Sequence, residues 1–413
     1  MSSLEQAQRA GLSQTEAERW IVAEGPQLTE LMHAAGELSE SVHGRQVTYS
    51  RKVFVPLTTY CRDDCGYCTF KRDPGQPGAG YLSPEEVLAL AYQGKQQGCK
   101  EVLFSLGDKP ELRFPEASNA LQAFGYATTA EYLAAMCALV LEETGLLPHA
   151  NPGTLSRKEM AALQPFCPSM GVMMENLTPR LRQKGGAHEQ APDKTPGARL
   201  AMLRFAGELR FPFTTGLLVG IGETPAERVE TLFQILAVHR QFGHVQEVII
   251  QNFCAKPGIP MADWPDATLT DLLRTIAVAR LVLGGQMNLQ APPNLSPETY
   301  PMLLLAGIND WGGVSPVTPD HINPEAPWPE IERLAQWSAE VGYSLRERLT
   351  IYPEFISDKQ GYLPEILHPS VQRLCGEDGY AIPFEKFSPS SRGEKNPAIS
   401  HGKSKGEHGK SRG

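Results

Sequence analysis

Short apolar runs alternate with longer amphipathic stretches over about residues 51–345. Each run has the length of a strand, and the stretches between runs repeat their apolar residues with the period of a helix. The runs fall at 53–57, 101–106, 148–151, 170–174, 213–219, 245–251, 287–290 and 305–309. Eight such alternations predict an α/β fold, namely a (β/α)8 barrel of the TIM type. Active sites in such barrels lie at the carboxyl ends of the strands.

The two ends of the chain follow other patterns. Residues 1–46 are predicted to form a helical N-terminal extension, because Ser13 and Glu16 have capping-box spacing and Pro26 follows Gly25 where a second helix would begin. The barrel is expected over 47–355, with a C-terminal extension over 356–387. Residues 388–413 carry six Lys/Arg against two Glu and almost no large apolar side chains. They are predicted to be a disordered basic tail.

Composition narrows the range of partners. The net charge of −9 and the pI near 5.7 predict no general attraction to nucleic acid or to an anionic membrane. No apolar run approaches the roughly 20 residues that a membrane-spanning helix needs. Eight cysteines in 413 residues is a low density, and no secretory signal is visible. We therefore expect a reduced, cytoplasmic protein.

Three of these cysteines are closely spaced, as Cys61-x3-Cys65-x2-Cys68. They offer three thiolates to one metal centre, whereas an iron–sulfur cube takes four ligands, so one iron would keep an open position. Two other hypotheses are three buried core thiols and a structural zinc site. Zinc sites usually pair two Cys-x2-Cys units, and the remaining five cysteines show no such pairing.

Polar and glycine residues gather where the predicted strands end. After the cysteine loop these are Gly107-Asp108, Glu175-Asn176, Gly220-Ile221-Gly222-Glu223, Gln251-Asn252, Pro292-Pro293-Asn294 and Asn309-Asp310. Such a set suits a polar ligand at the carboxyl end of the barrel.

The cysteine motif, with Tyr67 just before its last cysteine, resembles the signature of the radical S-adenosylmethionine (SAM) enzymes. The resemblance implies a [4Fe-4S] cluster held by Cys61, Cys65 and Cys68. It also implies that SAM occupies the fourth iron and is cleaved to methionine and a 5'-deoxyadenosyl radical.

The same resemblance assigns cofactor contacts. Gly107 and Asp108 stand where the family's Gly-Gly-Glu strand end binds the methionine amine, although Asp replaces Glu and one glycine is absent. The stretch 216–223, with Gly220, Gly222 and Glu223, resembles the segment near the adenine, which the Tyr67 backbone should also face. Glu175 is expected to hold the ribose hydroxyls; the alternatives are a catalytic base or a surface carboxylate.

Further blocks resemble one branch of the superfamily, the CofG family of deazaflavin-forming subunits of FO synthase. These blocks are 49–58, 107–111, 173–176, 191–194, 213–216, 243–253, 291–295 and 307–316. The resemblance implies that a tyrosine–ribitylaminouracil adduct, made by a CofH-type second subunit, is closed to 7,8-didemethyl-8-hydroxy-5-deazariboflavin (FO) with loss of ammonia. Ferredoxin or flavodoxin would supply electrons.

For this substrate, paired donors and acceptors are expected from the polar residues at the strand ends. The candidate substrate-binding residues are Gln251, Asn252, Asn294, Asn309 and Asp310. Glu175, Asp310 and His244 are the candidates for proton transfer, although a core or capping role is an alternative for His244. Two other functions stay open: a CofH-type or menaquinone-pathway radical SAM enzyme, and a non-enzymatic iron–sulfur electron carrier.

Overall fold

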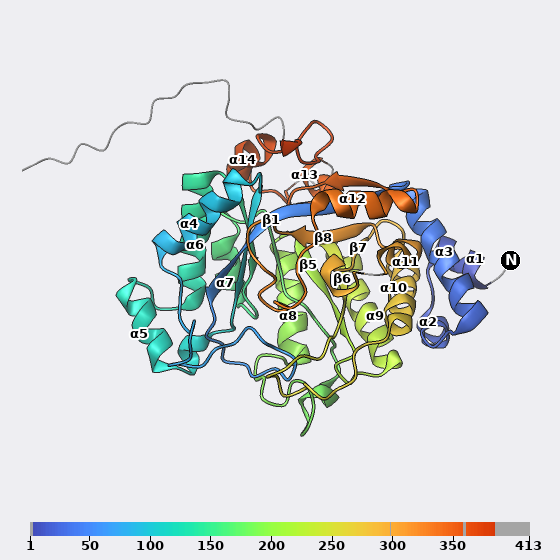
Figure 1. The fold of residues 1–413 in the computed structure, drawn as a ribbon, viewed down its shortest axis with the longest axis horizontal. Helices are drawn as coiled ribbons and strands as arrows, with labels where there is room; N and C mark the ends of the chain where they lie inside the picture. Colours follow the sequence, from blue (N-terminus) through green and yellow to red (C-terminus); the bar gives the residue numbers. More distant parts are fainter. Residues whose placement is uncertain (1–2, 298, 358–360, 385–413) are drawn as a thin grey trace, which may run out of the picture. The chain divides into compact units, whose positions relative to one another are not determined.

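In the computed structural model, which describes residues 3–297, 299–357 and 361–384, eight parallel strands close into a barrel (Figure 1). The strands are β1 (Gln46–Thr58), β2 (Glu101–Leu106), β3 (Leu147–Asn151), β4 (Ser169–Gly171), β5 (Phe213–Val219), β6 (Val245–Asn252), β7 (Asn288–Gln290) and β8 (Asp310–Val314). Pairing follows chain order from β2 to β8, and β1 closes the barrel by pairing with both β8 and β2. The predicted (β/α)8 fold is confirmed.

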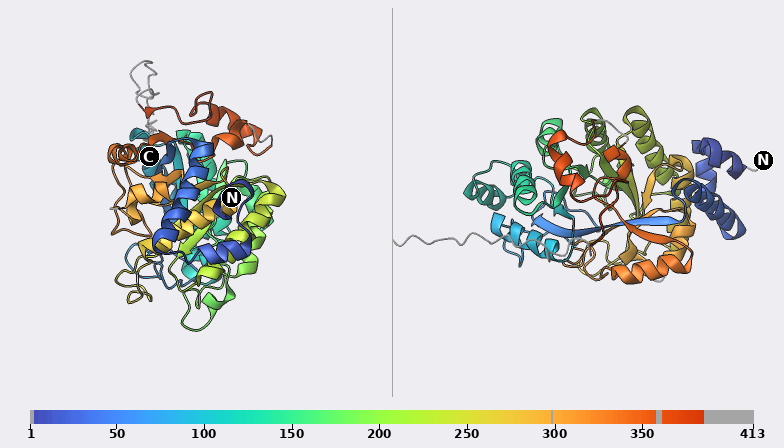
Figure 2. Two further views of the ribbon diagram at one scale, coloured as in Figure 1. Left: turned by 90° about the vertical axis from the view of Figure 1, so that its right-hand side faces the viewer. Right: turned by 90° about the horizontal axis from the view of Figure 1, so that it is seen from above.

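Helices surround the strands on all sides in the two views of Figure 2. Those of the barrel are α4 (Pro84–Gln96), α5 (Pro115–Ala123), α6 (Thr129–Thr144), α7 (Arg157–Leu163), α8 (Pro196–Glu208), α9 (Pro225–Phe242), α10 (Leu269–Leu283), α11 (Tyr300–Leu305) and α12 (Ile331–Glu340). Several begin with a capping box, in which a Ser or Thr side chain and a Glu three residues later satisfy the free N–H groups of the first turn. Ser83 and Thr224 cap α4 and α9 in this way.

The N-terminal extension is helical, as the sequence predicts. It consists of α1 (Ser3–Ala10), α2 (Gln14–Trp20) and α3 (Gly25–His43), and the predicted capping box of Ser13 and Glu16 is present at the start of α2. These helices pack at one side of the barrel, against α9 and α10 (Figure 1). They lie on the outside of the helical layer, and Val42 and His43 of α3 line a cavity at the amino-terminal end of the barrel.

The first strand shows how the sequence divides its two faces. Val53, Val55 and Leu57 are fully buried in the layer between barrel and helices. Lys52 and Phe54 alternate with them and line a cavity inside the barrel. Because successive side chains of a strand point to opposite faces, a polar interior and an apolar exterior follow from one alternating run.

The eighth strand lies later in the chain than the sequence predicts. Of the run 305–309, only Leu305 belongs to α11, which ends there; residues 306–309 form the turn that leads into β8, which begins at Asp310. Tyr300 stacks on Trp337 at 4.4 Å between ring centroids, so the apolar residues of α11 pack as a helix against α12. The glycine-rich strand carries too few apolar residues for the pattern to show it.

Beyond α12, a ninth strand β9 (Ser344–Glu347) pairs with the first residues of β1. The chain continues through α13 (Pro353–Ser357), a 3-10 turn (Glu365–Leu367) and α14 (His368–Gln372). Phe355, Tyr362 and Leu367 are buried in a small apolar cluster with Leu147 of β3.

The chain divides into two compact units, Met1–Ile382 and Pro383–Gly413. The barrel and the segment over α13 and α14 belong to the first unit. The predicted tail 388–413 lies outside the described residues. Within the described part of the chain, no helix combines the length and the apolar character that crossing a membrane requires.

Candidate functional site

The three cysteines of the motif lie on the loop after β1, and all three line one cavity at the carboxyl ends of the strands. This outer cavity has a volume of about 240 Å³. Its other walls include Asp63, Gly107, Asp108, Asn151, Glu175, Lys194, Arg199, Leu218, Gln251 and Asn252. The structure thus brings the cysteine loop together with residues that follow or end β2, β4 and β6.

The cysteine loop is fastened to the end of β2. The backbone N–H of Asp108 donates to Cys61 Sγ at 3.2 Å, and the backbone N–H of Arg62 donates to the Asp108 carbonyl at 2.8 Å. Gly107 makes this close approach sterically feasible, because a Cβ at that position would lie 1.9 Å from the Tyr60 carbonyl oxygen. The glycine therefore sets the distance between strand and loop.

The three cysteine sulfurs are not gathered closely enough to bind one ion together. Among the described residues, Cys61, Cys65 and Cys68 do not all lie within 4.8 Å of one another. Three thiolates on one tetrahedral zinc, each about 2.3 Å from the metal, would be roughly 4 Å apart. An iron–sulfur cube instead takes each thiolate on a different iron. The donor set fits such a cube, with one iron left without a protein ligand.

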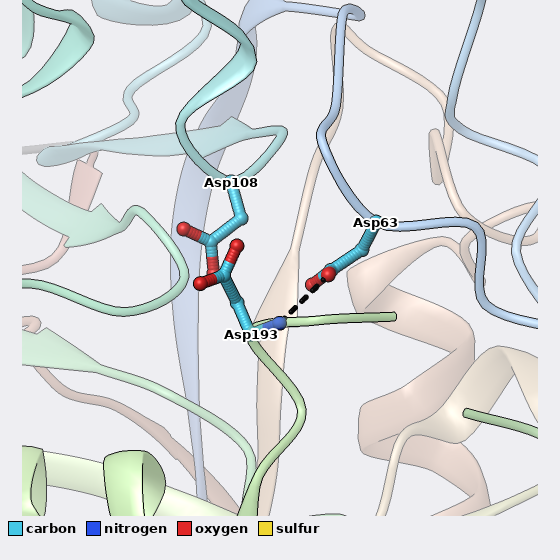
Figure 3. A group of neighbouring side chains, drawn as sticks. All are labelled: Asp63, Asp108 and Asp193. Atoms are coloured by element: carbon cyan, nitrogen blue, oxygen red, sulfur yellow. Dashed lines mark hydrogen bonds between the residues drawn. The ribbon is translucent and has the colours of Figure 1, made fainter. Parts of the chain in front are cut away.

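Three carboxylates gather beside Cys61. One oxygen from each of Asp63, Asp108 and Asp193 lies within 4.8 Å of the other two, and the side chains of Asp108 and Asp193 point toward one another (Figure 3). The backbone N–H of Asp193 donates to Asp63 Oδ1 at 3.0 Å. Burial and the neighbouring Asp193 raise the pKa of Asp108 to about 6. Within the described residues the trio has one ion pair, between Asp193 and Arg62 at 3.4 Å.

This surplus of negative charge fits a positively charged ligand group such as an α-ammonium. Lys194 and Arg199 line the same cavity. The carboxylates of Asp63 and Asp108 and the cations of Lys194 and Arg199 around one cavity together match the zwitterionic amino-acid part of SAM. The residues present therefore fit both the cluster and its co-substrate.

Glu175 lies at the centre of a buried network. Its carboxylate pairs with Lys194, lies 2.9 Å from His188 Nε2, and accepts a hydrogen bond from the Tyr67 hydroxyl. Burial alone would raise the pKa of Glu175, but the nearby Lys194 and Arg199 cations hold it well below the usual range. A carboxylate with so low a pKa is a poor proton acceptor, which disfavours the catalytic-base hypothesis.

Glu175 is 7% exposed, so the surface-carboxylate hypothesis is wrong. Its backbone has φ +58°, a left-handed conformation that is rare outside glycine and often found at functional sites. The predicted contact with the ribose hydroxyls stays a prediction.

Sequence reasoning gave no role to Lys194, Arg199 or His188. Lys194 stands in the block 191–194 that carries the family resemblance, and this membership could have marked it as a site residue. Arg199 lies in the first turns of α8 and reads as an ordinary helix residue. No local pattern distinguishes it.

The turn after β5 is held by its own hydrogen bonds and by an ion pair with α9. The Glu223 carboxylate accepts backbone N–H groups of Gly220 and Ile221, each at 2.8 Å, and pairs with Arg228 at 2.7 Å. The structure does not bring Gly220, Gly222 or Glu223 into the wall of the outer cavity, although Leu218 of the same strand lines it. The predicted adenine contact of this turn stays a prediction.

A second cavity of about 180 Å³ lies deeper in the barrel; we call it the inner chamber. Its walls include Lys52, Phe54, His149, Asn151, Glu247, Gln251, Gln290, His321, Trp328 and Arg348. Six residues line both cavities, namely Asn151, Val172, Met173, Gln251, Ile322 and Asn323. The two spaces are therefore contiguous.

Of the predicted substrate-binding residues, Gln251 lines both cavities and Asn252 lines the outer one. Asn294 lines neither: its amide nitrogen donates to Asp320 at 2.9 Å and to the Ala326 carbonyl at 3.1 Å. It holds the loop between β8 and α12, which supplies His321 and Trp328 to the inner chamber. Because the eighth strand was predicted too early in the chain, the sequence did not indicate that this loop lines the site.

Asn309 and Asp310 lie at the opposite, amino-terminal end of β8, and their predicted place in the site is wrong. Arg280 donates to Asn309 Oδ1 at 2.8 Å. Asp310 is fully buried and accepts two hydrogen bonds from Arg348, at 2.6 and 2.9 Å. Both side chains are taken up in polar contacts at the base of the barrel.

His244 is also far from the cavity walls. It immediately precedes β6, and its ring lies 5.9 Å from that of Phe242 and 6.3 Å from that of Phe213. The residue is completely buried at the amino-terminal end of the strand. Its proposed part in proton transfer is therefore wrong, and the alternative of a core histidine holds.

Comparison with known proteins adds independent findings. The family model described as the radical SAM superfamily matches residues 55–235. The chain is 53% identical over 335 residues to the 7,8-didemethyl-8-hydroxy-5-deazariboflavin synthase of Methanopyrus kandleri, covering 81% of this chain and 99% of that relative. It is 50% identical over 361 residues to the FO synthase of Mycobacterium tuberculosis, covering 84% of this chain and 42% of that protein.

Solved structures share the fold at low identity. The FeFe-hydrogenase maturase HydG from Carboxydothermus hydrogenoformans has a TM-score of 0.69 at 16% identity, covering 89% of this chain and 81% of that one. Methylornithine synthase (PylB) has a TM-score of 0.66 at 17% identity, covering 83% and 97%.

Proposed function

The chain belongs to the radical SAM superfamily and, within it, to the family of FO synthases, and we propose that it catalyses the ring closure that produces FO. The substrate is the 5-amino-5-(4-hydroxybenzyl)-6-(D-ribitylimino)-5,6-dihydrouracil adduct. Hydrogen is abstracted from it, the hydroxybenzyl and pyrimidine parts close to a third ring, and ammonia leaves. The enzyme is accordingly a carbon–nitrogen lyase, subunit 1 of FO synthase, in coenzyme F(420) biosynthesis.

One observation carries this proposal: the cavity that holds the three cysteines opens into a second, polar chamber inside the barrel. The first space offers thiolates and both signs of charge, as the cluster and SAM require. The second offers amide side chains and an aromatic wall, as a large neutral heterocycle requires. Substrate and cofactor can therefore meet at their shared walls.

Members of this family use a [4Fe-4S] cluster and SAM. When bound, they supply the one-electron chemistry that removes hydrogen from an unactivated carbon. Cys61, Cys65 and Cys68 would hold the cluster, and Asp108 with Lys194 would fix the two ends of the amino-acid group. The remaining task of the chain is to orient the adduct and to exclude water. The contiguous buried cavities suit that task.

The adduct has to be supplied by a second activity of FO synthesis. The chain spans less than half of the mycobacterial FO synthase but nearly all of the Methanopyrus relative. We propose that a separate CofH-type chain makes the adduct from tyrosine and 5-amino-6-(D-ribitylamino)uracil. A ferredoxin or flavodoxin would deliver the electron. Nothing in the site favours the electron-carrier alternative, which has no use for an inner chamber.

The test is anaerobic turnover of the reconstituted protein with dithionite, SAM and the purified adduct. Formation of 5'-deoxyadenosine together with fluorescent FO is the expected result. A fully loaded protein that forms neither product would refute the proposed reaction. Consumption of free tyrosine and the diaminouracil would instead identify a CofH-type enzyme.

A further inference from the structure

Three primary amide side chains in the inner chamber have no hydrogen-bond partner among the residues that the structure describes. Asn151, Gln251 and Gln290 come from the carboxyl-terminal parts of β3, β6 and β7, and all three line the chamber. Across the described residues, no hydrogen bond reaches any of these three amide groups. Gln290 is 6% exposed and the other two residues are partly buried, so the three amides face the space of the chamber with their hydrogen-bonding capacity unused. A ligand that displaces water from this space has to satisfy them, because a polar group without water or a partner costs about 1–3 kcal/mol.

The backbone of β8 is shaped to hold one of these amides. Gly312 has φ +72°, and a Cβ there would lie 2.1 Å from Gln290 Nε2. A Cβ on the next residue, Gly313, would lie 2.3 Å from Lys52 Cε. Two consecutive glycines therefore make room inside the barrel for the side chains of Gln290 and Lys52. Strand formation alone does not require two glycines here, whereas the space needed by these two side chains does.

Charges around the chamber are compensated within the protein. Lys52 pairs with Glu101, and Arg348 pairs with Glu247 at 3.0 Å and with Asp310 at 2.6 Å. An anionic ligand such as a phosphate would need a cation that is not already neutralised. The chamber is therefore suited to a neutral, polar ligand.

One wall of the chamber is flat and aromatic. Trp328 stacks on Phe54 with ring centroids 5.1 Å apart and planes 8° apart. Both rings line the chamber, Phe54 from β1 and Trp328 from the loop between β8 and α12. A flat wall beside unpartnered amides matches a planar heterocycle whose edge carries alternating N–H and C=O groups.

We propose that the inner chamber binds the pyrimidinedione ring of the adduct, with Asn151, Gln251 and Gln290 paired to its imide edge and Gln290 as a specificity-determining residue. This inference rests on the proposed function, since it names where that substrate is held. A primary amide offers one donor and one acceptor side by side, which is the complement of an imide N–H and C=O. Asn151 and Gln251 also line the outer cavity, so a ring held there leaves the hydroxybenzyl group at the boundary with the cofactor.

The test compares Gln290→Met with the wild type, because methionine keeps the volume and removes both hydrogen-bonding groups. The dissociation constant of the adduct is measured on the reconstituted holoenzyme with SAM and without reductant, so that no turnover occurs. We expect it to rise about tenfold or more, the effect of losing a buried pair of hydrogen bonds. The SAM dissociation constant and the iron and sulfide content should stay at wild-type values, and KM should change more than kcat.

Gln93→Met, on the exposed face of α4, is the matched control and should change none of these values. Unchanged adduct affinity in Gln290→Met would overturn the inference while leaving FO formation by the wild type intact. If that variant does not take up its cluster, Gln251→Met decides in the same assay. A loss of adduct affinity supports the inference, and wild-type affinity overturns it. A wild-type holoenzyme that binds SAM but makes no FO would instead remove the proposed function itself.

Discussion

The hydroxyl of Tyr67 donates a hydrogen bond to the carboxylate of Glu175, which ties the cysteine loop to the end of β4. The same carboxylate pairs with Lys194, and Arg199 acts on it electrostatically from nearby. Glu175 and Arg199 are buried and the Lys194 side chain is 12% exposed, so one carboxylate is the counter-charge for two cations beside the cluster site. The loop that carries the cysteines is thus positioned by a polar network as well as by backbone contacts.

Replacing Glu175 by Gln should destabilise the metal-free protein by about 3–5 kcal/mol, since it leaves buried cations without their partner. Tyr67→Phe removes a single hydrogen bond and should cost only about 0.5–1.5 kcal/mol. Denaturant unfolding measures both. Glu230→Gln, at an exposed position of α9, is the control. If Glu175→Gln unfolds like that control, the network does not hold the loop.

The cluster assignment predicts different effects for substitutions of the motif cysteines and of another cysteine in the same cavity. Cys61→Ala, Cys65→Ala and Cys68→Ala should each lose most of the iron and sulfide and the visible absorption of the reconstituted protein. Cys254 lines the same outer cavity, yet it lies outside the motif. Cys254→Ala should keep the cluster. A loaded, spectroscopically normal Cys65→Ala protein would contradict the ligand set.

A pH effect is expected where α3 packs on α10. Burial and the nearby Arg280 lower the pKa of His43 to about 4, and its ring contacts the Gly285 carbonyl at 2.8 Å. The unfolded chain then binds more protons than the native one between pH 4 and 6.5, so stability rises with pH over that window. The contribution is up to roughly 3 kcal/mol at 1.36 kcal/mol per pKa unit.

His43→Gln should flatten the pH dependence of the unfolding free energy between pH 4 and 6.5. His33, which is exposed on the same helix, provides the control substitution His33→Gln. An equal slope in wild type and His43→Gln would show that this histidine titrates normally in the folded protein.

Asp310 is predicted to be structural. Asp310→Asn breaks its buried pair with Arg348 and should lower the unfolding free energy by about 3–5 kcal/mol. The SAM dissociation constant of the protein that folds should stay unchanged, because Asp310 does not line the outer cavity. A variant of normal stability with a large loss of kcat alone would restore the catalytic hypothesis for this residue.

Local signals explain what the sequence predicts well. The cysteine spacing, the capping boxes of Ser13 and Ser83, and the β-branched runs of β5 and β6 are all short-range patterns, and the structure contains each of them.

Local sequence patterns do not predict the features that depend on how the barrel closes. Gly312 and Gly313 are strand residues that make room for side chains from β7 and β1, which no local pattern predicts. The error in β8 moved Asn309 and Asp310 to the wrong end of the barrel and concealed His321 and Trp328. Gln290 was read only as the last residue of a strand. Its role depends on residues that are distant in sequence.

The most direct measurement is the ratio of FO to 5'-deoxyadenosine formed by the reconstituted wild-type protein from adduct, SAM and dithionite. We expect that both products appear together, that neither forms in Cys65→Ala, and that free tyrosine with the diaminouracil gives no product. If 5'-deoxyadenosine accumulates without FO while the adduct stays intact, or if tyrosine and the diaminouracil are consumed, the assignment of this chain to the ring-closing step is contradicted.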